Sequence, residues 1–146
     1  MKSDFVHLHV HSQYSLLDAV CPIDGLTDLA KKMGMPALAI TDNGNLFGAI
    51  EFYSSCKKAG VKPIIGAEVY LAPESRFERS THGLQGASYP FVLLCKDEAG
   101  YRNLIELVTI GYEPLPSVTS THAAAEAGAP AVWDDQPDNI CFVADF

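Results

Sequence analysis

Three histidines alternate near the start of the chain, at His7, His9 and His11, within the run FVHLHVHS. Residues two apart point to the same side of a β-strand, so a strand here would bring imidazole rings together on one face. Imidazole nitrogens bind zinc, iron and other first-row metals. The spacing therefore predicts a metal site. The alternative is a half-exposed strand whose histidines bind nothing.

Side chains with oxygen ligand atoms occur directly after or within two other apolar runs. Asp42 and Asn43 follow ALAIT at 37–41, and Glu68 lies in KPIIGAEVYLA at 62–72. In α/β folds, functional side chains gather at the C-terminal ends of the strands. His9, His11, Asp42 and Glu68 lie at or near such ends, which favours the metal interpretation.

Apolar runs and helical periodicity alternate through the first 112 residues. We predict strands at 5–10, 37–41, 62–72 and 91–95. We predict helices at 22–33, between an Asn45 N-cap and Gly60, and after an Asp97 cap. Gly66 marks either a bulge or a close approach of two backbones. The alternation predicts an α/β fold with mainly parallel strands and right-handed crossovers.

Charge is unevenly spread along the 146 residues, whose net charge is −8. Residues 1–112 carry all ten Lys and Arg with twelve Asp and Glu, whereas residues 113–146 carry six acidic residues and no Lys or Arg. Neither part offers the basic face that a phosphate backbone requires, so we expect no autonomous binding to nucleic acid. The four cysteines lack a CxxC spacing, and no signal peptide or membrane span is evident, so we expect a cytoplasmic protein with reduced thiols.

The pattern of strands and helices fails after Tyr112. The segment 113–117 (EPLPS) breaks any helix, and 122–131 is alanine-rich and could form one short helix. Residues 140–144 could form either a short strand or an apolar end that favours association. We therefore expect two parts: residues 1–112 as the domain, and residues 113–146 as an atypical acidic, Ala/Pro-rich tail. The composition change indicates a domain boundary, a flexible tail or sequence foreign to the domain.

Four blocks occur in order between residues 4 and 112: HLHVHSQYSLLDA, PALAITDNGNLFGAIEFY, GVKPIIGAEVYLAP and LLCKDEAGYRNLIELV. Together they resemble the PHP (polymerase and histidinol phosphatase) domain family, and in particular its version at the N-terminus of bacterial DNA polymerase III alpha subunits. The resemblance implies the first half of a distorted PHP-type (β/α)7 barrel. It does not extend into residues 113–146, where a frame change or a truncation would each produce such a break.

The resemblance also implies a cluster of divalent metals, commonly zinc, manganese or iron. By motif match, the ligands would be His9, His11, Asp18 and Glu68. His7 would be a neighbour of the site, and Asp42 and Asn43 would be weak ligands or neighbours of the ligands.

Two positions depart from the family pattern. Asn43 stands where the second motif, usually TDHGN, has histidine, and Pro90 stands where a histidine usually precedes the fourth strand. An amide binds soft divalent metals less well than an imidazole, and proline offers no ligand atom. The later ligands of the family would lie beyond residue 146, so we expect partial or absent metal binding.

Two functions are compatible with these features. In the first, the chain is the PHP portion of a replicative DNA polymerase and braces the rest of the alpha subunit or docks a proofreading or accessory subunit. It would then meet DNA only through the intact polymerase. In the second, it is a metal-dependent phosphoesterase, either a 3′–5′ exonuclease or a phosphatase. The missing ligands favour the first.

Overall fold

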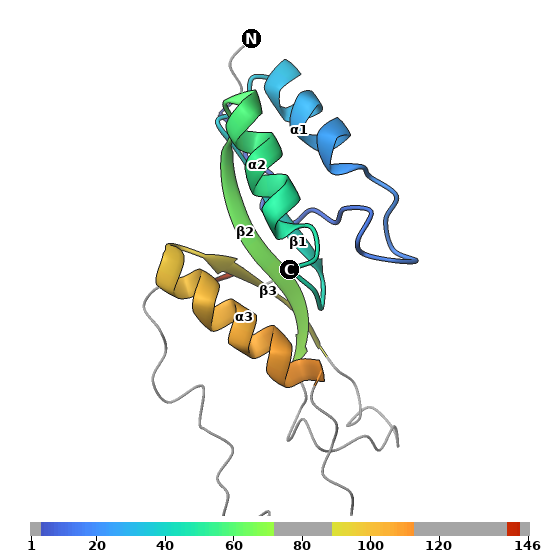
Figure 1. Cartoon of the computed structure of the whole chain (residues 1–146), viewed down its shortest axis with the longest axis vertical. Coiled ribbons are helices and arrows are strands. Elements are labelled where there is room, and N and C mark those ends of the chain that lie inside the picture. The colour runs from blue at the N-terminus through green and yellow to red at the C-terminus, as the bar shows by residue number, and fades with distance from the viewer. Residues whose placement is uncertain (1–3, 72–88, 113–139, 144–146) are drawn as a thin grey trace, which may run out of the picture.

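A computed structural model describes residues 4–71, 89–112 and 140–143 (Figure 1). The elements are α1 (Ile23–Lys32), β1 (Ala37–Asn43), α2 (Ala49–Ala59), β2 (Lys62–Leu71), β3 (Tyr89–Cys95), α3 (Glu98–Tyr112) and β4 (Ile140–Val143). The strands form one sheet in the order β1-β2-β3-β4. No helix in the described ranges is long and apolar enough to cross a membrane.

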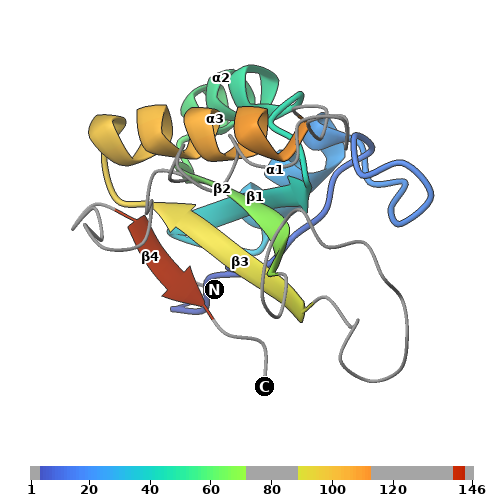
Figure 2. The ribbon, with the colours of Figure 1, turned by 90° about the horizontal axis from the view of Figure 1, so that it is seen from below.

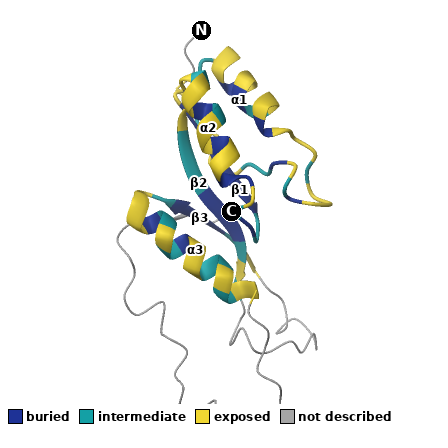
Figure 3. Ribbon diagram, in the orientation of Figure 1, coloured by how far each residue is buried: buried dark blue, intermediate teal, exposed yellow. Residues whose placement is uncertain are grey.

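The three helices lie on one side of this sheet (Figure 2). Alternate strand residues face them: Leu38 and Ile40 of β1 share a core cluster with Ile23 of α1 and Phe52 of α2. Further along the sheet, strand residues pack against Leu104 of α3 in a second cluster. The outward surfaces of the helices stay exposed, whereas β1 is buried along nearly its whole length and β2 and β3 are buried at their middle residues (Figure 3). One face of the sheet is thus closed by helices. The other face carries a small apolar cluster of Ala39, Val92 and Leu94 and, on β2, the Glu68 side chain.

Strand direction differs from the prediction. The β1–β2 pair is parallel, but β2–β3 and β3–β4 are antiparallel. The expectation of mainly parallel strands is therefore wrong for the described sheet. An apolar run reports that a strand is buried, but it does not report which way the strand runs, because direction depends on where the connecting segment brings the chain back.

The predicted first strand, 5–10, is an extended segment without regular pairing. Ala39 N donates to His7 O at 3.0 Å, and Thr41 N donates to Val10 O at 2.8 Å, so the segment follows β1 in the same direction. The acceptors, His7 and Val10, are three residues apart in the sequence, whereas the donors, Ala39 and Thr41, are two residues apart. One extra residue therefore interrupts the ladder, as in a β-bulge.

The other predicted elements are confirmed within one to three residues at their ends, with one corrected cap. Gly48, not Asn45, precedes the first residue of α2. The Asn45 side chain instead stabilises the preceding turn, because it accepts from Phe47 N at 3.1 Å and donates to Tyr14 O at 3.1 Å. Asp97 does cap α3, where its carboxylate accepts from Gly100 N at 2.9 Å.

Gly66 is a site of close approach and not a bulge. The pairing register runs through it without a break, from Thr41 on one side to Leu94 on the other. A Cβ at this position would collide with the carbonyl oxygen of Leu93 and lie 2.7 Å from Leu94 Cδ2.

The short strand predicted near the C-terminus is present as β4 and pairs with β3. The other expectations for the tail, including the short helix at 122–131, fall outside the described residues. The boundary after residue 112 stays a prediction.

Candidate metal centre

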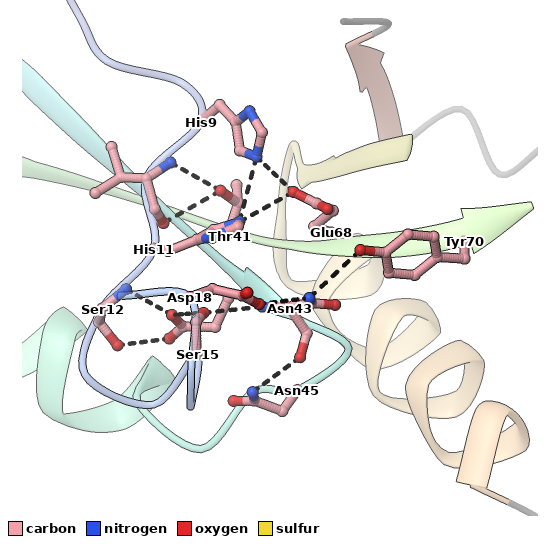
Figure 4. A network of polar contacts seen from close by, with 12 residues as sticks. His9, His11, Ser12, Ser15, Asp18, Thr41, Asn43, Asn45, Glu68 and Tyr70 are labelled. Atoms are coloured by element: carbon pink, nitrogen blue, oxygen red, sulfur yellow. Dashed lines mark hydrogen bonds and ion pairs between the residues drawn. The ribbon is translucent and has the colours of Figure 1, made fainter. Parts of the chain in front are cut away.

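Three ligand-type atoms converge on the helix-free side of the sheet (Figure 4). His9 Nε2 lies 2.6 Å from Glu68 Oε2, His11 Nε2 lies 3.0 Å from the same oxygen, and the two Nε2 atoms lie 3.3 Å apart. Among the described residues, this is the one group of at least three His, Cys, Asp or Glu side chains close enough to share a metal ion.

The local backbone explains why these side chains meet. His9 and His11 flank Val10, which packs with the helix-side core, so the two imidazoles turn to the opposite face. Glu68 lies in the middle of the sheet, where it pairs with Asn43 of β1 and Val92 of β3. The extended segment beside β1 therefore carries its two rings over the carboxylate on β2.

The donor set fits a divalent cation. Two ligand nitrogens bound to a tetrahedral zinc ion are about 3.3 Å apart, given Zn–N distances near 2.05 Å, which matches the separation of the two Nε2 atoms. The two distances from Glu68 Oε2 to these nitrogens, 2.6 and 3.0 Å, are hydrogen-bond distances, so the carboxylate would move slightly outward to share a cation with them. Two histidines and one carboxylate also form a known ligand set of catalytic zinc sites, which leave further coordination positions open.

Burial is graded across the cluster. The Glu68 side chain is 8% exposed, whereas those of His11 and His9 are 21% and 34% exposed. The carboxylate thus lies at the base of the cluster, and the imidazoles form its solvent-facing rim. Such a site admits an ion from solvent on the histidine side.

Asp18 is placed outside this cluster. Its Oδ2 accepts a hydrogen bond of 2.9 Å from the Asn43 side-chain amide, whose nitrogen also lies 3.5 Å from the Tyr70 hydroxyl. The structure therefore joins Asp18 to Asn43, the position at which the family usually has histidine. Asp18 as a metal ligand stays a prediction.

Asp42 also lies apart from the cluster. It is 2% exposed, and its carboxylate accepts hydrogen bonds from the loop that follows His11. These contacts make it a structural neighbour of the site.

The remaining predicted positions are peripheral. His7 is exposed, and its ring lies edge-on to Phe5 with a centroid separation of 4.8 Å. Pro90 is an exposed residue of β3 that pairs with Tyr70. Two of the three alternating histidines therefore meet, as the spacing predicted, and the third does not.

Sequence reasoning missed Ser12, Ser15 and Tyr70. The two serines are buried at 0% and 1% exposure and hold the loop to β1. The sequence contained a hint of this role, because serines that directly follow the alternating histidines are well suited to hydrogen-bond the backbone of the next turn. Tyr70 carried a weaker signal, namely its position two residues after Glu68 on the same strand face.

Comparison with known proteins identifies the family. The PHP domain profile matches residues 7–130, so the chain belongs to the PHP domain family. The resemblance noted in the sequence is thereby confirmed.

Relatives of this chain include DNA polymerase III alpha subunits. The one from Borreliella burgdorferi is 52% identical over 111 residues, which cover 76% of this chain and 10% of the relative. The one from Thermus aquaticus is 49% identical over 114 residues, covering 76% of this chain and 9% of the relative. The chain therefore matches a PHP region of alpha subunits and spans about a tenth of their length.

A solved structure of a protein assigned as a metal-dependent phosphoesterase, from Bifidobacterium adolescentis, shares the fold. The TM-score is 0.55 at 18% identity, over 74% of this chain and 33% of the other. The expectation of an α/β, partial PHP barrel is confirmed.

Proposed function

We propose that this chain is the PHP portion of a bacterial DNA polymerase III alpha subunit and that it binds a divalent metal through His9, His11 and Glu68. The observation that carries the metal assignment is the convergence of three ligand atoms from two distant segments. The polymerase assignment is supported by identities of 43–52% to alpha subunits in several bacteria.

Within that protein, the proposed role is structural. The helix-free face of the sheet and a centre with three clustered ligands suit a domain that braces the polymerase body or docks a proofreading or accessory subunit in the cytoplasm. Asn43 holds Asp18 by a hydrogen bond and Pro90 offers no ligand atom, so the described ligands suffice for one metal ion but not for the two-metal clamp used by many phosphoesterases. DNA would be reached only through the intact polymerase.

A second candidate function, metal-dependent phosphoester hydrolysis by a phosphatase or 3′–5′ exonuclease, is favoured by one observation. The two histidines are partly exposed, so a bound cation would keep coordination positions open to solvent. A metal bound there would supply Lewis acidity and an activated water. Asp18 and Tyr70, joined through Asn43 next to the cluster, would then position a substrate or a proton.

Metal analysis of the purified chain tests the metal assignment. We expect one equivalent of zinc or manganese in the parent protein and loss of that metal in His9→Ala and Glu68→Ala. His7→Ala is the matched control, because it removes an imidazole from the same segment but outside the cluster. A parent protein without stoichiometric metal would reject the assignment.

Hydrolysis of an activated phosphodiester separates the two functions. The structural role predicts no turnover above that of Glu68→Ala with added zinc, manganese or iron. Turnover by the parent protein that Glu68→Ala abolishes would favour the phosphoesterase.

A further inference from the structure

The most deeply buried charged side chain near the site does not belong to the metal cluster. Asp42 is 2% exposed at the end of β1 and accepts three short hydrogen bonds. Oδ1 accepts from Ser12 N at 2.6 Å and from Ser15 Oγ at 2.7 Å, and Oδ2 accepts from Ser12 Oγ at 2.7 Å. All three donors come from the loop that begins directly after His11.

The alternation along β1 separates Asp42 from the ligands. Leu38 and Ile40 face the helices, so Asp42 shares their side of the sheet, whereas Asn43 shares the side of Glu68. A Cβ on Gly48, the residue before α2, would lie 3.3 Å from Asp42 Oδ2 and 2.8 Å from Tyr14 Cδ2. The carboxylate is thus enclosed between the loop and the start of α2.

The buried polar groups of the loop need this carboxylate as their hydrogen-bond acceptor. Ser12 and Ser15 are 0% and 1% exposed, so without Asp42 their hydroxyls and the Ser12 amide would lose a buried acceptor. A buried donor without an acceptor costs about 1–3 kcal/mol. The loop would have to move to recover hydrogen bonds, and His11 is covalently attached to Ser12.

Further hydrogen bonds connect Ser15 and Gln13 to β1 and to the later residues of the same loop. Ser15 Oγ also accepts from Asn43 N at 3.0 Å, and Ser15 O accepts from Asp18 N at 3.0 Å. Gln13 N donates to Cys21 O at 2.9 Å and closes the loop at its base. Asp42 therefore joins a buried, regular strand to the segment that sets the positions of His11 and Asp18.

We infer that Asp42 is a positioning residue: it fixes the loop after His11 so that the His11 imidazole meets His9 and Glu68, and it contributes no ligand atom itself. This inference rests on the proposed metal site. Groups that orient metal ligands typically change metal affinity by about 10–100-fold when removed.

Zinc affinity and the visible spectrum of the cobalt(II)-substituted protein test the inference. We expect Asp42→Ala to weaken zinc binding by about ten-fold or more and to change the cobalt bands, which report ligand geometry. Asp42→Asn keeps one acceptor oxygen, so it should restore part of the affinity. Asp97→Ala is the control, since it removes an exposed carboxylate that caps α3 away from the cluster, and it should leave affinity and spectrum unchanged.

Zinc affinity and cobalt bands in Asp42→Ala equal to those of the parent would overturn the inference. If Asp42→Ala does not fold, Ser15→Ala and Asp42→Asn give the same comparison with smaller losses. A parent protein that binds no metal would refute the metal assignment of the proposed function. The positioning role would then be judged by NMR on the metal-free chain, where Asp42→Ala should abolish the contact between the His9 and His11 rings, whose centroids are 5.0 Å apart. If the contact between the two rings persists in Asp42→Ala, the positioning role of Asp42 is overturned.

Discussion

The side-chain amide of Asn43 donates a 2.9 Å hydrogen bond to the carboxylate of Asp18. Asn43 also pairs with Glu68 across the β1–β2 ladder, so it lies between Asp18 and the candidate metal centre. Replacing this amide by an imidazole removes the hydrogen bond to Asp18 and places a ring nitrogen on the strand position next to Glu68.

We expect Asn43→His to increase zinc affinity several-fold or to raise the stoichiometry above one, because an imidazole adds a nitrogen ligand beside Asp18 and releases that carboxylate from the amide. Calorimetric titration with parallel metal analysis measures both quantities. Asn43→Gln, which keeps the amide, is the control. Equal binding by the histidine variant and the parent would contradict the prediction.

Gly66→Ala should destabilise the fold strongly. The added Cβ would collide with the Leu93 backbone, which cannot move without disturbing the β2–β3 ladder, so we expect a loss of about 1–3 kcal/mol or more in the free energy of unfolding. Urea denaturation measures this loss. Gly25→Ala in α1 meets no atom within 4 Å and should be neutral or stabilising by about 0.5–1 kcal/mol. Similar free energies for the two variants would argue against the close approach.

Two thiols, the buried Cys56 and the partly buried Cys95, should make the stability of the fold sensitive to alkaline pH. Burial raises the pKa of Cys56 to about 11, and burial together with the nearby Asp97 raises the pKa of Cys95 to about 12. The unfolded chain loses these protons near the ordinary value of 9.0, so the folded state binds more protons above that pH. The thiol contribution to stability is therefore complete below pH 9 and decreases as pH rises toward 11–12.

Urea unfolding at several pH values between 8 and 11 measures this decline in the free energy of unfolding. The double variant Cys56→Ala, Cys95→Ala should decline less steeply than the parent. Identical pH profiles would show that other groups cause the alkaline loss.

The isolated chain should associate with itself or require a partner. Large apolar side chains are at least 70% exposed on the loop after His11 and around the start of α2, namely Leu16, Leu17, Val20, Phe47 and Ile50. Open sheet edges and exposed apolar patches favour association. Size-exclusion chromatography with light scattering measures the mass, and a monomer that unfolds cooperatively would contradict the expectation.

Local patterns in the sequence were sufficient for most elements and for the core of the site. Apolar periodicity and capping residues placed α1, β1 and β3, because these signals act within a few residues. The alternation of His9 and His11 placed both rings on one face for the same reason. Glu68 was predicted as a further ligand by the motif match to the PHP family, together with Asp18, which lies outside the cluster.

Tertiary structure decided what local patterns cannot encode. The antiparallel direction of β3 depends on the path of the chain between strands, and the bulged course of the segment 7–10 depends on its fit to β1. The separate roles of two neighbouring residues were decided in the same way: strand alternation turns Asp42 toward Ser12 and Ser15, and turns Asn43 toward Asp18. The sequence alone determined which groups were available for a metal centre, whereas long-range packing determined which of them meet.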